Sequence, residues 1–209
     1  MIIIKSIAKL LLGKGVHKSY AQSGEDLVIK PFLPKRKGVY VDVGCYHPIL
    51  YSNTYRLYKE GWSGIVIDPN PNLKPLFSFF RPRDTFYNTA VGTSGEGEYF
   101  VFADGAYNTL DKESAKEYEK KRTACIKVVP VSIKPLMEIC KNVEYIDLMS
   151  VDVEGMDLQV LSTHDWSKAP RVIIVEAAPR SPVASFLEEK GYRLVGLTHL
   201  NSIFLLPHA

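Results

Sequence analysis

The sequence predicts a single α/β domain in three layers, with a mostly parallel β-sheet between helices and an antiparallel hairpin at the C-terminus. Short apolar and β-branched runs alternate with amphipathic stretches along the chain. This alternation is typical of a parallel sheet whose strands are joined by crossover helices. The length of 209 residues is enough for one sizeable core and short for two ordinary domains.

Five runs are expected to form the parallel strands: 39–43, 65–68, 85–91, 145–153 and 172–176. Three stretches between or after them have the apolar spacing of helices: 53–60, 73–80 and 181–190. Two last runs flank a short loop with a turn-forming residue: 192–197 and 202–206. They are expected to form the hairpin that completes the sheet.

The region 92–131 interrupts this alternation. Residues 98–102 have the pattern of an antiparallel strand, and the highly charged residues 112–122 have the pattern of a helix. Because neither fits the βα order, we expect an insertion here that covers the functional site.

Composition and charge exclude several classes of protein. A hydrophobic fraction of 46% with 23% charged residues is typical of a globular chain. A net charge of +3 is too small to predict nucleic-acid binding, which needs a dense basic face. The three cysteines are odd in number and too widely spaced for a zinc site, which favours a reducing, cytoplasmic location.

Residues 1–19 form a separate N-terminal segment, and residues 20–209 form the expected domain. The segment is apolar but is interrupted by Lys5 and Lys9, and it is too short to span a bilayer. No small-residue cleavage site follows it. We expect a helix that packs on its own domain or on a second subunit; contact with a membrane surface is the less common alternative.

A nucleotide-type loop follows the first predicted strand. Gly44 lets the backbone approach a ligand closely, and Ser52 is placed to cap the helix that follows. Asp68 ends the second strand, where an acidic side chain accepts hydrogen bonds from both ribose hydroxyls. These residues predict a site for a nucleoside.

The loop lacks the three spaced glycines that let a pyrophosphate approach a helix. A nicotinamide-dependent epimerase or reductase would share Asp68 but should show those glycines and a Tyr-x-x-x-Lys pair, and neither is in the right place. A nucleoside ligand without phosphates fits better. S-adenosylmethionine is such a ligand, and an ordinary α/β turn with a surface Asp is the structural alternative.

Several separate segments, in order from about residue 20 to 192, resemble the FkbM family of S-adenosylmethionine-dependent methyltransferases. They are YAQSGED at 20–26, VDVG at 41–44 followed by His47-Pro48, SNT at 52–54, GWSGI at 61–65, IDPNP at 67–71, RPRD at 81–84, AVG at 90–92 and SVDVEG at 150–155. One such segment would be weak evidence, whereas eight in order make chance similarity improbable.

The resemblance implies a Rossmann-like, class I methyltransferase sheet with the cofactor across the ends of the first strands. It implies roles for each part of the cofactor site: Asp42, Gly44 and Tyr46 at the methionine end, Asp68 at the ribose, Asn88 and Ala90 at the adenine, and Gln22 and Asp26 on a segment that closes over the cofactor. Ser52 is a further candidate on the cofactor side. The sequence departs from many methyltransferases at His47-Pro48, which stiffens the loop. Residues 107–110 resemble a family stretch expected to meet the acceptor.

Acidic residues follow the fourth and fifth predicted strands. Strand alternation places Asp152 and Glu154 on one side, and Asp152 is also a cofactor candidate. Glu176 ends the next strand, and these strand ends converge on one crevice. A carboxylate there, or His47, could take a proton from a hydroxyl, and grouped carboxylates could instead hold Mg²⁺.

The function expected from these residues is O-methylation of a hydroxyl on a sugar, glycan or secondary-metabolite precursor. A nucleotide-cofactor-binding protein without catalysis is the alternative from another class, and the carboxylates argue against it. The sequence leaves the acceptor, the metal requirement and the oligomeric state open.

Overall fold

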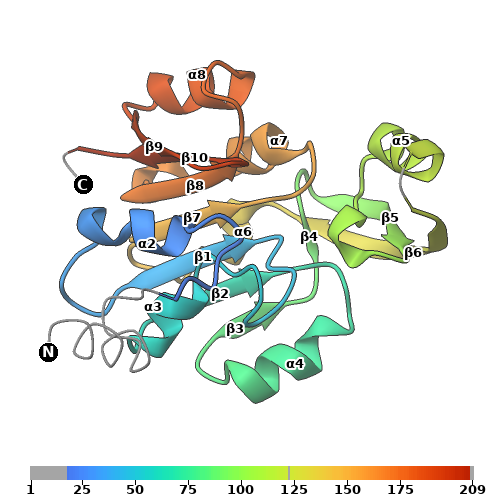
Figure 1. Cartoon of the computed structure of the whole chain (residues 1–209), viewed down its shortest axis with the longest axis horizontal. Coiled ribbons are helices and arrows are strands. Elements are labelled where there is room, and N and C mark those ends of the chain that lie inside the picture. The colour runs from blue at the N-terminus through green and yellow to red at the C-terminus, as the bar shows by residue number, and fades with distance from the viewer. Residues whose placement is uncertain (1–17, 122, 208–209) are drawn as a thin grey trace, which may run out of the picture.

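The computed structural model describes residues 18–121 and 123–207, so the predicted N-terminal segment lies almost wholly outside the described residues. Its main sheet has seven strands in the order β3 (Thr85–Tyr87), β2 (Ser63–Ile67), β1 (Val39–Val43), β7 (Leu148–Val151), β8 (Val172–Glu176), β10 (Asn201–Leu205) and β9 (Arg193–Leu197). Strands β3, β2, β1, β7 and β8 pair in parallel with their neighbours in that order, and β10 is antiparallel to both β8 and β9. The predicted sheet and its C-terminal hairpin are therefore confirmed (Figure 1).

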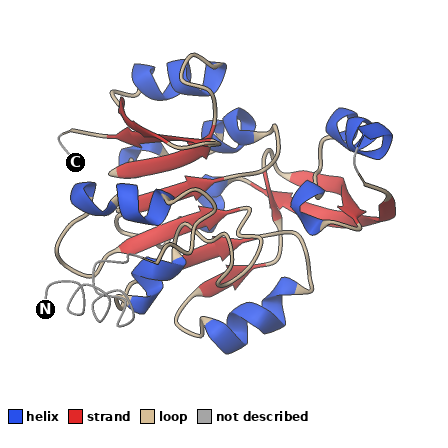
Figure 2. Ribbon diagram, in the orientation of Figure 1, coloured by secondary structure: helices blue, strands red, loops and turns tan. Residues whose placement is uncertain are grey.

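Helices cover both faces of this sheet (Figure 2). One apolar cluster joins the sheet to α6 (Leu136–Ile139), α7 (Asp157–Ser162) and α8 (Pro182–Glu189). A second cluster, on the opposite face, includes residues of α3 (Tyr55–Lys59) and α4 (Leu73–Phe80), with Ile29 after α2 (Glu25–Val28). Three short 3-10 turns complete the helical structure of the described chain: η1 (Lys30–Phe32), η2 (Gly105–Tyr107) and η3 (Trp166–Lys168).

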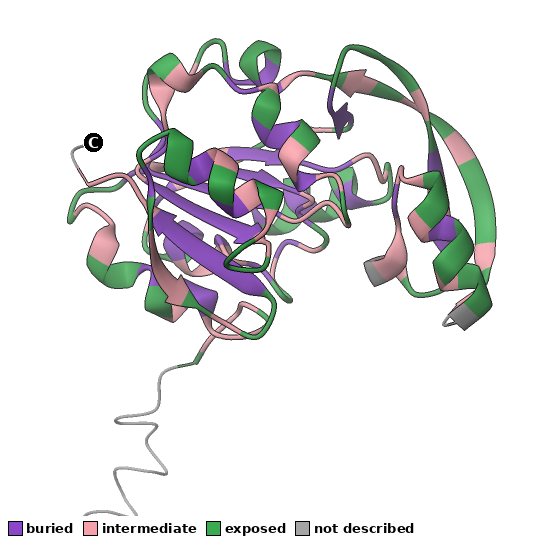
Figure 3. Ribbon diagram, turned by 90° about the horizontal axis from the view of Figure 1, so that it is seen from above, coloured by how far each residue is buried: buried purple, intermediate pink, exposed green. Residues whose placement is uncertain are grey.

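The central strands are apolar on both sides because both faces are covered. Residues 172–175 of β8 are all fully buried, which explains the continuous apolar run in the sequence. In β1, Val41 and Val43 belong to one core cluster and Tyr40 to the other. The view from above shows this buried sheet between partly exposed helices (Figure 3).

The single strand expected at 85–91 is wrong, because the chain changes sheets in the middle of it. Residues of β3 pair with β2, whereas β4 (Ala90–Val91) pairs with β6 (Cys125–Lys134) in a second sheet. Side chains hold the chain at the break: Asn88 Nδ2 donates to the Asp68 carbonyl at 3.0 Å, and Thr89 Oγ1 donates to the Ser132 carbonyl at 2.8 Å.

The insertion forms a three-stranded sheet in the order β4, β6 and β5 (Gly95–Phe102), with α5 (Lys112–Lys121) between β5 and β6. We call residues 95–134 the arm. It stands at the carboxyl ends of the parallel strands (Figure 1). The sequence did not indicate β6, because Pro130 interrupts its pattern; β4 pairs only with Ile133 and Lys134, so Pro130 lies where one edge of β6 is open.

The run expected at 145–153 gives a strand of only four residues. Asp147 ends it on the N-terminal side, because its carboxylate accepts the Val39 backbone N–H at 3.0 Å and pairs with Arg36 at 2.8 Å. No helix in the described part of the chain is long and apolar enough to cross a membrane.

Candidate functional site

Gly44 lies where the loop after β1 touches the loop after β7. Its φ of +78° is left-handed, and a Cβ at this position would lie 1.8 Å from the Asp152 carbonyl oxygen. Its N–H donates to the Ile67 carbonyl at 2.9 Å, which also ties the loop to the end of β2. Only glycine fits here, because the backbone of the neighbouring loop lies so close. The predicted approach of this backbone to a ligand stays a prediction.

Asp68 lies directly after β2 and is 6% exposed. Burial raises the pKa of its carboxyl to about 7, although the Asn70 backbone N–H, which donates to it at 2.8 Å, acts to lower this pKa. Tyr99 on the arm lies near it, since burial first and then the Asp68 charge raise the pKa of the Tyr99 hydroxyl. Asn88 also lies beside Asp68, because its side-chain amide donates a hydrogen bond to the Asp68 backbone carbonyl.

A small apolar cavity adjoins Asp68. It is lined by Gly44, by Ile67 and Pro69 on either side of Asp68, and by Ala90. Leu110 of the arm and Met156 also line it. Of the residues predicted for the cofactor, Gly44 and Ala90 line this cavity. Asp68 lies between two of its lining residues in the chain, and Asn88 bonds to the Asp68 carbonyl.

Two other predicted cofactor residues, Asp42 and Ser52, make hydrogen bonds that hold the loop after β1. Asp42 is buried, and its Oδ2 accepts the Thr54 hydroxyl at 2.5 Å. Burial raises the pKa of Asp42, while the Arg81 charge lowers it. Ser52 Oγ accepts the Tyr55 N–H at the start of α3 at 3.1 Å and an Arg81 N–H at 3.2 Å, but the N-cap residue of this helix is Thr54 and not Ser52 as expected.

Arg81 connects these groups, because its guanidinium donates to both Ser52 and Thr54. Its guanidinium is fully buried and pairs with Asp84 at 2.6 Å, and a second nitrogen donates to Thr54 at 2.9 Å. Its carbon also lies 5.3 Å from the centre of the Tyr40 ring. The RPRD segment at 81–84 therefore has a structural role in holding the cofactor loop.

Three more predicted residues, Gln22, Asp26 and His47, also line neither cavity. Gln22 is exposed. Asp26 is fully buried and pairs with Arg56 at 3.1 Å, which fixes the segment before the sheet. His47 Nδ1 accepts the backbone N–H groups of Ile49 and Leu50 at 3.1 and 3.0 Å, and burial lowers its pKa. Its role as a base stays a prediction.

Asp152, Glu154 and Glu176 come together as the sequence predicts. One carboxylate oxygen from each lies within 4.8 Å of the others. Glu154 has a φ of +52°, and Tyr46 and Tyr51 are the other two non-glycine residues with positive φ in the described chain. All three lie in loops at the carboxyl edge of the sheet, where backbone strain commonly accompanies function.

Burial, followed by the charges of Glu176 and Glu154, raises the pKa of Asp152 well above its ordinary value. Asp157 at the start of α7 lies beside them, and burial raises the pKa of its carboxyl to about 7. Acid–base sites commonly bring carboxylates together in this way.

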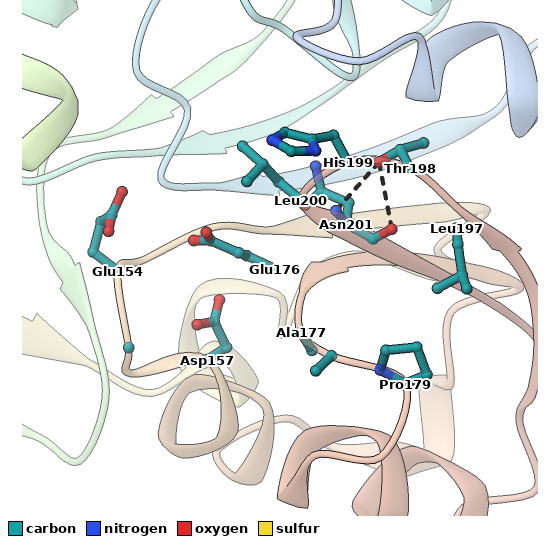
Figure 4. A pocket seen from close by; sticks show the side chains of 12 residues that line it. Glu154, Asp157, Glu176, Ala177, Pro179, Leu197, Thr198, His199, Leu200 and Asn201 are labelled. Atoms are coloured by element: carbon teal, nitrogen blue, oxygen red, sulfur yellow. Dashed lines mark hydrogen bonds between the residues drawn. The ribbon is translucent and has the colours of Figure 1, made fainter.

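Three of these acids, Glu154, Asp157 and Glu176, line one wall of an open cleft of about 580 Å³. Figure 4 shows Glu154, Asp157 and Glu176 on one side and the turn between β9 and β10, with Leu197, His199 and Leu200, on the other. Glu25, buried in α2, holds this turn, because its Oε1 accepts the Thr198 hydroxyl at 2.6 Å and Asn201 Nδ2 at 2.9 Å.

The arm brings two further side chains to these sites, of which the sequence singled out only Leu110. Tyr118 of α5 donates its hydroxyl to Glu154 Oε2 at 2.7 Å. Leu110, expected to meet the acceptor, lines the small cavity instead of the cleft. Tyr118 has no local sequence signal, since its place beside Glu154 depends on how the arm folds back.

Comparisons with known proteins agree with this architecture. A sequence model described as the methyltransferase FkbM domain matches residues 42–194. The fold is similar to a methyltransferase FkbM from Methylobacillus flagellatus KT, with a TM-score of 0.52 and 12% identity over 89% of this chain and 48% of that chain. It is also similar to a TehB-like SAM-dependent methyltransferase from Corynebacterium glutamicum, with a TM-score of 0.44 and 12% identity over 96% of each chain.

None of the curated proteins matches the sequence. The chain spans about half the length of the M. flagellatus structure, at 48%. The family match at 42–194 nevertheless covers most of the chain, including the cofactor loop, Asp68 and the carboxylates. By this match, the chain belongs to the FkbM family of S-adenosylmethionine-dependent methyltransferases.

Proposed function

We propose that this protein transfers the methyl group of S-adenosylmethionine to a hydroxyl group of an acceptor, a sugar, glycan or secondary-metabolite precursor. One observation carries the choice of oxygen: Asp152, Glu154 and Glu176 offer carboxylate oxygens within 4.8 Å of one another, and two of them, Glu154 and Glu176, line an open cleft. A hydroxyl needs such a group, because it must lose a proton as it becomes an ether.

The chemical step balances without another reactant. The acceptor oxygen attacks the methyl carbon, a C–O bond forms, and the S–C bond of the sulfonium breaks to leave S-adenosylhomocysteine. The hydroxyl proton goes to a carboxylate of the cluster. Most of the rate comes from holding oxygen, carbon and sulfur in line, and the contact between Gly44 and the Asp152 carbonyl sets the distance between the two loops that do so.

The same three carboxylates fit a divalent metal such as Mg²⁺, because all three donors are oxygens and they face one another. When bound, Mg²⁺ would lower the pKa of the acceptor hydroxyl. Asp152, Glu154 and Glu176 would hold it.

The cleft also favours some acceptors over others. Among its lining residues in the described chain, Glu154, Asp157 and Glu176 are acids and none is Lys or Arg. The opposite wall is apolar at Leu197 and Leu200. We expect a neutral or amine-bearing acceptor with an apolar face, because a phosphorylated acceptor would be repelled by the acids.

Calorimetric titration with S-adenosylhomocysteine, and separately with NAD, tests the cofactor. We expect saturable binding of the homocysteine nucleoside that Asp68→Ala abolishes, and no binding of NAD. Binding of NAD alone would overturn the proposal, and binding of neither would favour a protein without this cofactor.

Methyl transfer from radiolabelled cofactor then tests the reaction. The acceptor panel pairs neutral sugars and amino sugars with the matching sugar phosphates, with and without Mg²⁺. Glu154→Gln and Asp152→Asn should lower the rate by about a hundredfold or more while S-adenosylhomocysteine still binds. Full activity in both variants would remove the carboxylates from the mechanism.

A further inference from the structure

The arm reaches the proposed cofactor site through one corner of its chain, residues 108–110. Thr109 is 1% exposed, and its carbonyl and N–H bond reciprocally to Phe100 at 2.9 and 3.2 Å. Asn108 Oδ1 accepts the Phe102 N–H at 2.8 Å. The corner is therefore fixed to β5, and the direction of the next side chain, Leu110, is fixed with it.

Leu110 points into the small apolar cavity. The opposite walls of that cavity come from the ends of β1 and β2 in the main sheet, with Gly44, Ile67 and Pro69, and from Ala90 in β4 of the second sheet. The Leu110 side chain lies close to Gly97 of β5, because a Cβ built on that glycine would lie 3.4 Å from Leu110 Cδ2. Leu110 thus faces the loop that would carry the methionine end and the residues next to the ribose carboxylate.

The chemistry of this cavity matches the adenosine half of the cofactor. Adenine is flat and its faces are apolar, so it binds between apolar side chains, while the ribose needs an acceptor such as Asp68 one residue away. The ends of β1, β2 and β4 supply one side of such a slot, and the arm supplies the other through Leu110. The inference rests on the proposed cofactor.

The cavity holds about 30 Å³, roughly one water molecule. A purine ring needs more room, and the backbone of Gly44, the Pro69 ring and the short Ala90 side chain have little freedom to move. Leu110 and Met156 have rotatable side chains at the same cavity. On this proposal, the ring would enter only if these two side chains changed rotamer, while the backbone at 108–110 kept its place on β5.

We infer that Leu110 is a cofactor-contacting residue that packs on the adenosine part of S-adenosylmethionine, so the arm forms part of the cofactor site. Cofactor binding should then order the arm as well as the loops of the main sheet. The corner at 108–110 would close one site, while Tyr118 of the same arm bonds to Glu154 of the other.

Calorimetry with S-adenosylhomocysteine tests the inference without any acceptor. Leu110→Ala should raise the dissociation constant about tenfold, through lost apolar contact. Leu110→Met should bind within about twofold of the unchanged protein, because it keeps the apolar volume. The matched control is Leu76→Ala on the outer side of α4, where the leucine is 37% exposed, and it should bind as the unchanged protein does.

A second ligand separates the adenosine contact from other effects. 5′-Methylthioadenosine lacks the amino-acid part, and Leu110→Ala should weaken its binding by the same factor as that of S-adenosylhomocysteine. Hydrogen exchange is measured on the unchanged protein and so does not depend on whether a variant folds. S-adenosylhomocysteine should protect the amides of residues 108–110 from exchange.

Unchanged affinity in Leu110→Ala, or no protection at 108–110 while S-adenosylhomocysteine binds, would overturn the inference and leave the proposed function standing. No binding of S-adenosylhomocysteine to the unchanged protein would overturn both. The two failures are therefore distinct.

Discussion

Tyr118 and Glu154 are joined by a hydrogen bond of 2.7 Å between residues 36 positions apart in the sequence. Tyr118 lies on α5 of the arm, and Glu154 lies in the loop after β7. The Tyr118 ring packs against Phe102 and Tyr107, with ring centres 6.0 and 5.1 Å away. The bond therefore connects a packed element of the arm directly to a proposed catalytic carboxylate.

Tyr118→Phe removes this bond and keeps the ring. We expect kcat to fall about tenfold once an acceptor is in hand, since hydrogen bonds to charged groups contribute about 1.5–3 kcal/mol. The dissociation constant of S-adenosylhomocysteine should not change. Tyr145→Phe is the control, because Tyr145 precedes β7 at the opposite edge of the sheet and is 43% exposed. A loss of cofactor affinity in Tyr118→Phe would indicate a structural role instead.

Cofactor binding should depend on pH through Asp68. Burial raises the pKa of this carboxyl to about 7, so it is largely ionised at pH 8 and largely protonated at pH 6. On the proposed role of Asp68, the ionised form would accept both ribose hydroxyls. Affinity for S-adenosylhomocysteine should therefore rise from pH 6 to pH 8, by at most about tenfold per pH unit below the pKa. Calorimetry at three pH values measures this.

Asp68→Asn should bind weakly and show a flat profile over the same range. The stability of the free protein should change in the opposite direction: a raised pKa in the folded state means that the folded chain holds this proton more tightly, so the Asp68 contribution is lost as pH rises through about 7. A profile in Asp68→Asn as steep as that of the unchanged protein would assign the pH dependence to another group.

Gly44→Ala should destabilise the protein and abolish cofactor binding. The new Cβ would lie 1.8 Å from the Asp152 carbonyl oxygen, and the φ of +78° disfavours a side chain. We expect a loss of about 3 kcal/mol in the free energy of unfolding, measured by urea denaturation. Gly95→Ala is the matched control, because a Cβ there has no neighbour within 4 Å. Equal losses in both variants would contradict the close approach.

Arg81→Met should cost about 3–5 kcal/mol of stability, because it leaves Asp84 buried without its partner. The loop after β1 depends on the same guanidinium through Ser52 and Thr54, so cofactor affinity should fall too. Lys116→Met breaks the exposed pair with Glu113 and should cost less than about 1 kcal/mol. Denaturation curves that coincide for the two variants would show that the Arg81 network is unimportant.

The sequence by itself determined the parallel sheet, the hairpin and the convergence of the acids. The run 172–175 reads as a strand because both its faces are buried, and this burial selects apolar, β-branched residues whatever the rest of the chain does. Asp152 and Glu176 could be placed together because the carboxyl ends of neighbouring parallel strands meet at one edge.

Only the tertiary structure decided where the arm lies and what it adds. The change of sheets at Asn88 and Thr89 is made by side-chain bonds to Asp68 and Ser132, which lie up to 43 positions away. Strand β6 is a strand because β5 pairs with it, despite Pro130. Tyr118 and Leu110 reach their sites because the arm folds back over the sheet edge. Such contacts depend on distant partners, and local residue patterns carry no information about partners that are distant in the chain.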